Sequence, residues 1–181
     1  MGWKNRMLRL IVASTAVLPV AAMAGSFYIG PMVEFTSFSK DNARFQGLAP
    51  HLTLGYGDLL TGCVYLAGEI GVGPKTLKWT DTKNNKGIDL KTTSNYGASL
   101  IPGYILDNVV MIYLRLGIVA TNFDSLNTTK QGFTAGIGLE GVLDPNWSVR
   151  GEYDVTKYAA INGVGHVSSG TYAVGLKYTF L

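Results

Sequence analysis

The sequence predicts an all-β protein, an eight-stranded antiparallel up-and-down β-barrel that spans a membrane. Three observations lead to this fold. Large apolar residues alternate with small or polar ones in eight segments of about ten residues each. Glycines and charged residues share one face of these segments, whereas the other face is apolar. Short and long connections alternate along the chain, as in barrels with a turn end and a loop end.

The chain begins with a segment typical of a secretory signal peptide. Three cationic residues come first: Lys4, Arg6 and Arg9. An apolar run follows at 10–20, and Ala22-Met23-Ala24 offers small residues at the two positions that a signal peptidase reads. A transmembrane helix needs about 20 apolar residues, more than this run provides. We expect cleavage after Ala24, which divides the chain into a signal peptide (1–24) and a barrel domain (25–181).

Cleavage would also change the net charge. The precursor holds 15 Lys and Arg against 12 Asp and Glu, and three of the bases would leave with the signal peptide. The mature chain would then carry no net charge, so we expect no nucleic-acid partner, because such binding needs a concentrated basic face. The lone Cys63 excludes an intramolecular disulfide.

The first four strands are predicted at 27–36, 50–57, 63–73 and 94–106. Alternation assigns their outward, apolar faces, in chain order, to Phe27, Ile29, Val33 and Phe35; Leu52, Leu54 and Tyr56; Val64, Leu66, Ile70 and Val72; and Tyr96, Ala98, Leu100 and Tyr104. The opposite faces are rich in glycine.

The last four strands are predicted at 111–118, 131–142, 147–155 and 170–181. Their outward faces are Ile112, Leu114, Leu116 and Ile118; Phe133, Ala135, Ile137 and Leu139; Trp147, Val149, Tyr153 and Val155; and Tyr172, Val174, Leu176, Tyr178 and Phe180. Tight turns fit at Asp107-Asn108 and at Asp144-Pro145-Asn146. The apolar faces extend about 26 Å along a strand, or about 20 Å vertically in a tilted barrel, which fits a thin bilayer.

Charges on the glycine side decide which face is the interior. Alternation places five acids and three bases there: Glu34, Glu69, Glu140, Glu152, Asp154, Arg115, Arg150 and Lys177. A soluble lipocalin-like barrel would have the opposite arrangement, with an apolar interior. We predict a polar lumen with a charge network of Glu34, Glu69, Arg115, Glu140, Arg150, Glu152 and Lys177, because unpaired buried charges are costly. Candidate partners of Lys177 are Glu34, Glu69, Glu140 and Glu152.

Three segments resemble the small outer-membrane barrels of the OmpA/OmpX and opacity-protein-like surface antigen group. They are FYIGPMVEF, YGASLIPGYILDNVVMIYLRLG and the closing GTYAVGLKYTFL. The resemblance implies an outer-membrane location and assembly by the barrel-assembly machinery, which would recognise the last strand through Tyr178 and Phe180. The chain departs from the pattern because Leu181 follows the terminal aromatic residue.

Two motifs suggest chemistry but lack the required context. Gly136-Ile137-Gly138-Leu139-Glu140-Gly141 matches a dinucleotide-binding fingerprint, yet it lies inside a predicted strand rather than before a helix. His166 and Ser168 are similar to the His-x-Ser pair of barrels that deacylate lipid A. No Asp or Glu follows Asp154 to orient the histidine, and Ser169 stands where an asparagine is expected. We therefore expect no catalytic, cofactor-binding or metal site.

The segment 74–93 is predicted to be the most distinctive outer loop. It carries Lys75, Lys78, Trp79, Lys83, Lys86 and Lys91. This basic loop would suit lipopolysaccharide phosphates or acidic extracellular or host polymers, although a merely solvated loop is the alternative.

The sequence thus predicts a monomeric surface-interaction protein, with the features of an adhesin, in the lipid of the outer membrane. A narrow low-conductance pore and a lipid A-modifying enzyme are the alternatives. An eight-stranded interior is just wide enough for side chains to fill, which disfavours a pore.

Overall fold

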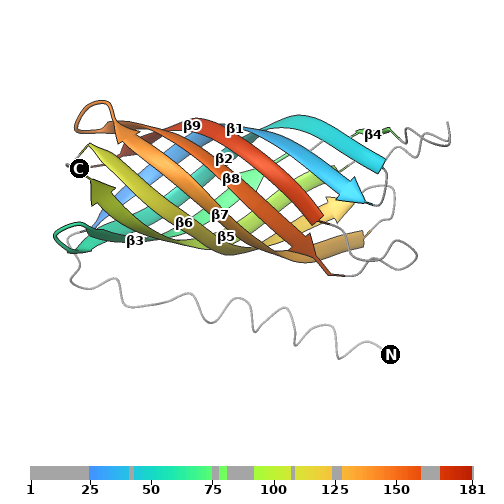
Figure 1. Ribbon diagram of the computed structural model, residues 1–181, viewed down its shortest axis with the longest axis horizontal. Helices are drawn as coiled ribbons and strands as arrows, with labels where there is room; N and C mark the ends of the chain where they lie inside the picture. The colour runs from blue at the N-terminus through green and yellow to red at the C-terminus, as the bar shows by residue number, and fades with distance from the viewer. Residues whose placement is uncertain are drawn as a thin grey trace.

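The computed structural model describes residues 25–40, 43–74, 78–80, 92–106, 109–123, 128–159 and 168–180. The regular structure of these residues is entirely β (Figure 1). The strands are β1 (Ser26–Lys40), β2 (Ala43–Thr61), β3 (Val64–Gly73), β4 (Lys78–Thr80), β5 (Thr92–Leu106), β6 (Val110–Phe123), β7 (Thr128–Val142), β8 (Trp147–Tyr158) and β9 (Ser168–Thr179). No helix among these residues is long and apolar enough to cross a bilayer.

Eight long strands close into an antiparallel barrel. They are hydrogen-bonded in the order β1-β9-β8-β7-β6-β5-β3-β2, and β1 pairs with β2 from Ser26↔Gly57 to Lys40↔Ala43 to close the ring. Closure pairs backbone groups between strands and leaves no open edge, which is what a sheet in hydrocarbon requires. The predicted eight-stranded antiparallel barrel is therefore confirmed.

A ninth, short strand corrects the sequence prediction. β4 lies within the segment 74–93, which was expected to be a loop, and it pairs only with β2, from Gln46↔Lys78 to Arg44↔Thr80. It keeps the register that relates β3 to β2, so it continues the edge of β3 beyond the barrel. Its three residues, Lys78-Trp79-Thr80, are too few to show an alternation signal, and the loop prediction was wrong over them.

The β1–β2 hairpin is longer than predicted for a related reason. The predicted strands covered 27–36 and 50–57, where apolar residues alternate. Pairing continues to Lys40 and Ala43 because the backbone ladder does not need an apolar face outside the membrane. Figure 1 shows the hairpin and β4 extending at the right-hand end, whereas the C-terminus and the short connections lie at the left-hand end.

The short connections define a turn end. Between β2 and β3, Gly62 adopts φ 37°, a left-handed conformation that favours glycine. Between β7 and β8, the Asp144 carboxylate accepts hydrogen bonds from the backbone N–H groups of Asn146 and Trp147, both at 2.8 Å, which confirms the predicted turn. The predicted Asp107-Asn108 turn lies outside the described residues.

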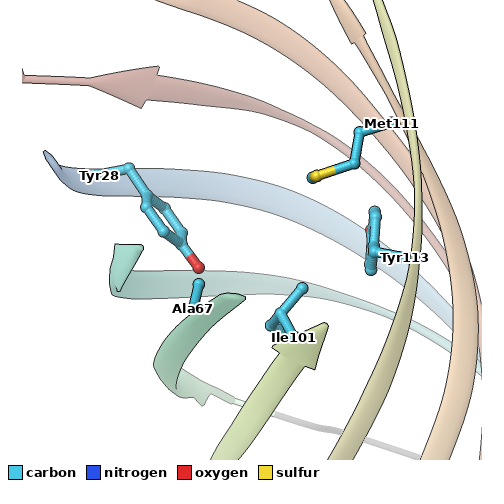
Figure 2. Packing of buried hydrophobic residues seen from close by; sticks show 5 residues of the cluster. All are labelled: Tyr28, Ala67, Ile101, Met111 and Tyr113. Carbon is cyan, nitrogen blue, oxygen red and sulfur yellow. The ribbon is translucent and has the colours of Figure 1, made fainter. Parts of the chain in front are cut away.

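The two faces of the barrel have the predicted polarity. Phe27 and Tyr172 are about 60% exposed on the outside, and most of the other large outward residues are likewise exposed, whereas Ile29, Tyr56 and Tyr178 are half-buried. The buried side chains point inward. On the turn side of the lumen, five of them form an apolar cluster: Tyr28, Ala67, Ile101, Met111 and Tyr113 (Figure 2). A Cβ added to Gly138 would overlap the Tyr113 ring, so glycine makes room for the aromatic residue.

Candidate functional site

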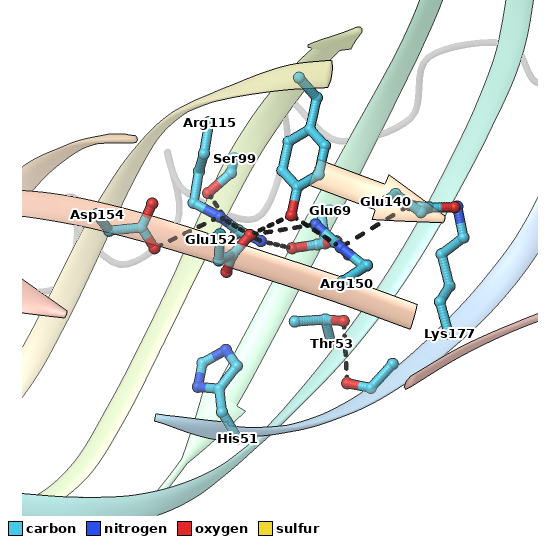
Figure 3. A network of polar contacts seen from close by, with 12 residues as sticks. His51, Thr53, Glu69, Ser99, Arg115, Glu140, Arg150, Glu152, Asp154 and Lys177 are labelled. Atoms are coloured by element: carbon cyan, nitrogen blue, oxygen red, sulfur yellow. Dashed lines mark hydrogen bonds and ion pairs between the residues drawn. The ribbon is translucent and has the colours of Figure 1, made fainter. Parts of the chain in front are cut away.

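The centre of the lumen is occupied by a carboxylate held between two guanidinium groups (Figure 3). Arg115 Nη2 lies 2.5 Å from Glu69 Oε1, and Arg150 Nη1 lies 2.7 Å from Glu69 Oε2. The three residues come from β6, β8 and β3, so the contacts cross the barrel. The Glu69 side chain is fully buried. Both of its oxygens therefore receive charged donors, which offsets the cost of removing it from water.

A second carboxylate completes this centre. Glu152 Oε2 accepts from Tyr113 Oη at 2.8 Å and from Arg115 Nη2 at 3.1 Å, and it lies 3.4 Å from Arg150 Nη2. The Tyr113 hydroxyl in turn accepts from Arg150 Nε at 3.1 Å, and the guanidinium carbon lies 4.9 Å from the centroid of the Tyr113 ring. Two acids and two bases therefore form a charge-balanced plug, defined as Glu69, Arg115, Arg150 and Glu152.

The turn side of the plug is also paired. Lys177 forms an ion pair with Glu140, which accepts a further hydrogen bond from Ser148 Oγ at 2.9 Å. The ammonium nitrogen lies 4.9 Å from the centroid of the Tyr28 ring and 5.6 Å from that of Tyr65, within cation–π range. Each charge on this side thus meets an opposite charge and at least one further polar or aromatic group.

The loop side of the plug, toward the end opposite the short turns, contains two further carboxylates, those of Asp154 and Glu34. Asp154 Oδ2 lies 3.7 Å from Arg115 Nε, the long contact of a cation already engaged by the plug. Glu34 Oε1 lies 3.3 Å from His51 Nδ1, and Figure 3 shows His51 apart from the guanidinium groups. Above these residues, hydroxyl pairs line the walls: Thr36 with Thr171, Thr134 with Thr156, and Thr121 with Tyr158. Four of these residues, Thr134, Thr156, Tyr158 and Thr171, line a cavity of about 60 Å³.

The structure brings together most of the predicted charge network. The connected residues are Glu69, Arg115, Glu140, Arg150, Glu152 and Lys177. Glu34 contacts His51 instead. Of the four candidate partners of Lys177, Glu140 is the one that pairs with it.

Three participants were not assigned to the network from the sequence. The hydroxyl of Tyr28 donates to Glu69 Oε2 at 3.0 Å, Tyr113 links Arg150 to Glu152, and Asp154 lies beside Arg115. Alternation gave the signal, because it places all three on the inner face. It does not say which inward side chains meet across the lumen.

The predicted loop site lies largely outside the described residues, as Lys75, Lys83, Lys86 and Lys91 do. For Lys78 and Trp79 the structure describes the backbone, as part of β4. His166 also lies outside, and Ser168 is the exposed first residue of β9. Among the described residues, no group of three or more His, Cys, Asp or Glu side chains could hold a metal ion.

The predicted assembly residues, Tyr178 and Phe180, lie at the end of β9, next to β1. The Tyr178 and Phe180 rings pack edge to face at 5.0 Å, and Tyr178 packs against Trp147 at the same distance. The Phe180 N–H donates to the carbonyl of Phe27 at 2.8 Å, and the Phe180 side chain is exposed. The end of the chain thus presents an aromatic group at the turn end of the outer surface.

Comparison with solved structures shows the same architecture in known barrels. Neisserial surface protein A is 21% identical, with a TM-score of 0.64, over 87% of this chain and 100% of that chain. The attachment invasion locus protein Ail of Yersinia pestis, in complex with the heparin analogue sucrose octasulfate, is 17% identical, with a TM-score of 0.58, over 87% and 100%. Ail in a phospholipid bilayer nanodisc is 19% identical, with a TM-score of 0.53, over 86% and 99%.

At these identities the similarity shows the fold. No curated protein is similar enough in sequence to match. The sequence does match the family model described as the outer membrane protein beta-barrel domain, over residues 10–180. With the closed barrel and its apolar outer face, this match shows that the chain belongs to the family of outer membrane protein beta-barrel domains.

Proposed function

We propose that the protein is a surface-interaction protein whose barrel is an anchor in the bacterial outer membrane and whose loops contact extracellular ligands. The observation that carries this proposal is the occupied lumen. The plug spans the interior with contacts of 2.5 to 3.4 Å, and the apolar cluster packs beside it. A barrel filled in this way provides an anchor but offers no wide path for solutes.

The ligand class follows from the charge of the longest predicted outer segment. Five lysines stand against Asp81 and Asp89 between residues 74 and 93: Lys75, Lys78, Lys83, Lys86 and Lys91. Such a segment attracts anionic polymers. The Ail structure was determined with a heparin analogue, and this supports sulfated polysaccharide as the ligand class to test first.

The test compares cells that display the natural chain with cells that display a variant in which the five lysines are replaced by glutamine. We expect the variant to lose most heparin binding, and the binding of the natural chain to fall as salt is added. Lys130→Gln with Lys157→Gln, on β7 and β8, is the matched control and should retain binding. Equal binding by all three chains, at equal surface density, would contradict the proposal.

The remaining partners belong to the same proposal. We expect a monomer that contacts outer-membrane lipid and lipopolysaccharide, exported by a signal peptide cleaved after Ala24. Phe180→Ala should lower the amount of assembled barrel, because the barrel-assembly machinery would lose its aromatic contact. The assembled fraction can be measured from heat-modifiable mobility on a gel.

A lipid A-modifying enzyme is the alternative that carries catalysis. Cells with and without the protein should show the same acyl pattern of lipid A by mass spectrometry. A changed pattern that His166→Ala abolishes would replace the surface-interaction proposal with an enzymatic one.

A further inference from the structure

A groove of about 780 Å³ crosses the outer wall of the barrel from β3 to β8. The strand register joins five of its outward side chains into one continuous cross-strand row, which consists of Ile70, Ala98, Ile118, Phe133 and Lys157. Ile118 is 68% exposed and Phe133 is 56% exposed, so the groove lies on the face that meets lipid.

Alanines make the floor of this groove. Ala98 lies in register between Ile70 and Ile118, and in the next outward row, two residues nearer the loop end of each strand, Ala120 lies between Tyr96 and Gln131. A short side chain between longer ones leaves a depression in the wall. The depression is therefore a consequence of side-chain size on an otherwise regular sheet.

The groove rises from the interior of the membrane toward its outer rim. β3 and β8 both begin at the turn end of the barrel, and Ile70 lies six residues after Val64, whereas Lys157 lies ten residues after Trp147. At about 3.3 Å per residue and a strand tilt of about 40°, this difference places Lys157 about 10 Å nearer the loop end than Ile70. The deep end is apolar, and the rim end carries a cation and an amide.

The charge at the rim gives the groove a preference among lipids. An apolar floor alone would accept any acyl chain, because lipid tails are as apolar as the side chains that they replace. Lys157 is exposed, and the described lining residues include no acidic side chain. A lysine at this depth attracts an anionic headgroup, and the Gln131 amide can donate to the same group.

We propose that this groove binds lipopolysaccharide, with an acyl chain of its lipid A over Ala98 and Ala120 and a lipid A phosphate at Lys157 and Gln131. The polarity of the groove matches such a lipid along its length, and its rim end faces the leaflet in which lipopolysaccharide resides. The inference rests on the outer-membrane anchor proposed above, but it does not depend on the ligand of the loops.

The experiment titrates purified lipopolysaccharide into the folded barrel in phosphatidylcholine nanodiscs and follows the amide NMR spectrum. The signals of Ala98, Ala120 and Lys157 should shift and reach saturation. The signal of Ala135 should not, because Ala135 occupies an outward position of β7 on the turn side of Phe133, outside the groove.

Filling the floor tests the place of the acyl chain. The double variant Ala98→Leu with Ala120→Leu should weaken binding by about threefold or more, because the leucines occupy the space of the chain and remove its dispersion contacts. Ala135→Leu is the matched control and should bind as the natural chain does. Lys157→Gln should weaken binding by about threefold, the scale of an exposed ion pair, whereas Lys130→Gln on β7 should not.

Phosphatidylglycerol at the same mole fraction distinguishes the lipid. It should bind more weakly, because lipid A carries more phosphates and more acyl chains. Heat-modifiable mobility shows whether each variant is folded. The absence of a saturable shift, equal affinity of the natural chain and the filled-floor variant, or equal affinity for the two lipids would each overturn the proposal. Heparin binding by displayed cells is a separate measurement, so the groove and the loop ligand can fail independently.

Discussion

The two halves of the lumen solve the problem of buried charge in different ways. On the turn side, Lys177 and Glu140 contact each other directly, with Ser148 and the Tyr28 ring beside them. On the loop side, Glu34 contacts a histidine at 3.3 Å and Asp154 lies 3.7 Å from Arg115. The turn-side pair borders a pocket of about 390 Å³ that Tyr28, Tyr65, Glu140 and Lys177 help to line, whereas the cavity beside Glu34 and Asp154 has a volume of about 60 Å³. We therefore expect the direct ion pair of the turn half to contribute more to stability than the longer described contacts of the loop half.

The plug separates the two halves, and Arg150→Met should produce the largest effect. The change removes the guanidinium that contacts Glu69 and Glu152, so that Arg115 is the one described cation still in contact with these two buried carboxylates. Breaking a buried ion pair in this way costs about 3–5 kcal/mol. Urea unfolding in lipid vesicles, followed by tryptophan fluorescence, measures the free energy of unfolding. A loss below about 1 kcal/mol would mean that the plug does not stabilise the barrel.

The turn half is tested by a double-mutant cycle on Lys177 and Glu140. Lys177→Met should cost about 2 kcal/mol, because Glu140 loses its charged donor but keeps the Ser148 hydroxyl. The double variant with Glu140→Leu should recover most of this loss, since no buried charge is then left without its partner. Additive losses in the same unfolding assay would show that the two side chains act independently.

The smallest effect is expected in the loop half. Glu34→Gln keeps an oxygen that can face His51 across the 3.3 Å contact, so the free energy of unfolding should change by less than about 1 kcal/mol. Glu140→Gln, the same change in the turn half, should cost more because Lys177 loses its carboxylate. Similar losses for the two variants would remove the distinction between the halves.

The sequence predicts the architecture well because alternation acts over every strand. Residues that face lipid alternate with residues that face the polar lumen, so each strand has a sequence period of two. This period assigns Glu69, Arg150 and Lys177 to the inner face. Partner choice depends on register and tilt, which alternation does not contain. Glu34 pairs in register with Ala173, four residues along β9 from Lys177, or about 13 Å along the strand. That distance explains why Lys177 contacts Glu140 rather than Glu34.

The features that the sequence does not predict lie where the apolar pattern ends. The extended part of the β1–β2 hairpin and β4 lack a regular alternation of apolar and polar residues, and backbone pairing defines them. Contacts across the lumen, such as those of Glu69 with Arg115 and Arg150, join strands far apart in the chain, and they arise from the curvature of the closed sheet.

The central claim is that the plug closes the lumen, so that the barrel is an anchor rather than a pore. Single-channel recording in planar bilayers tests it most directly. The natural chain should give no stable conductance steps, because Glu69, Arg115, Arg150 and Glu152 fill the interior with mutual contacts. Reproducible, long-lived steps of uniform size from the purified folded monomer would contradict the account.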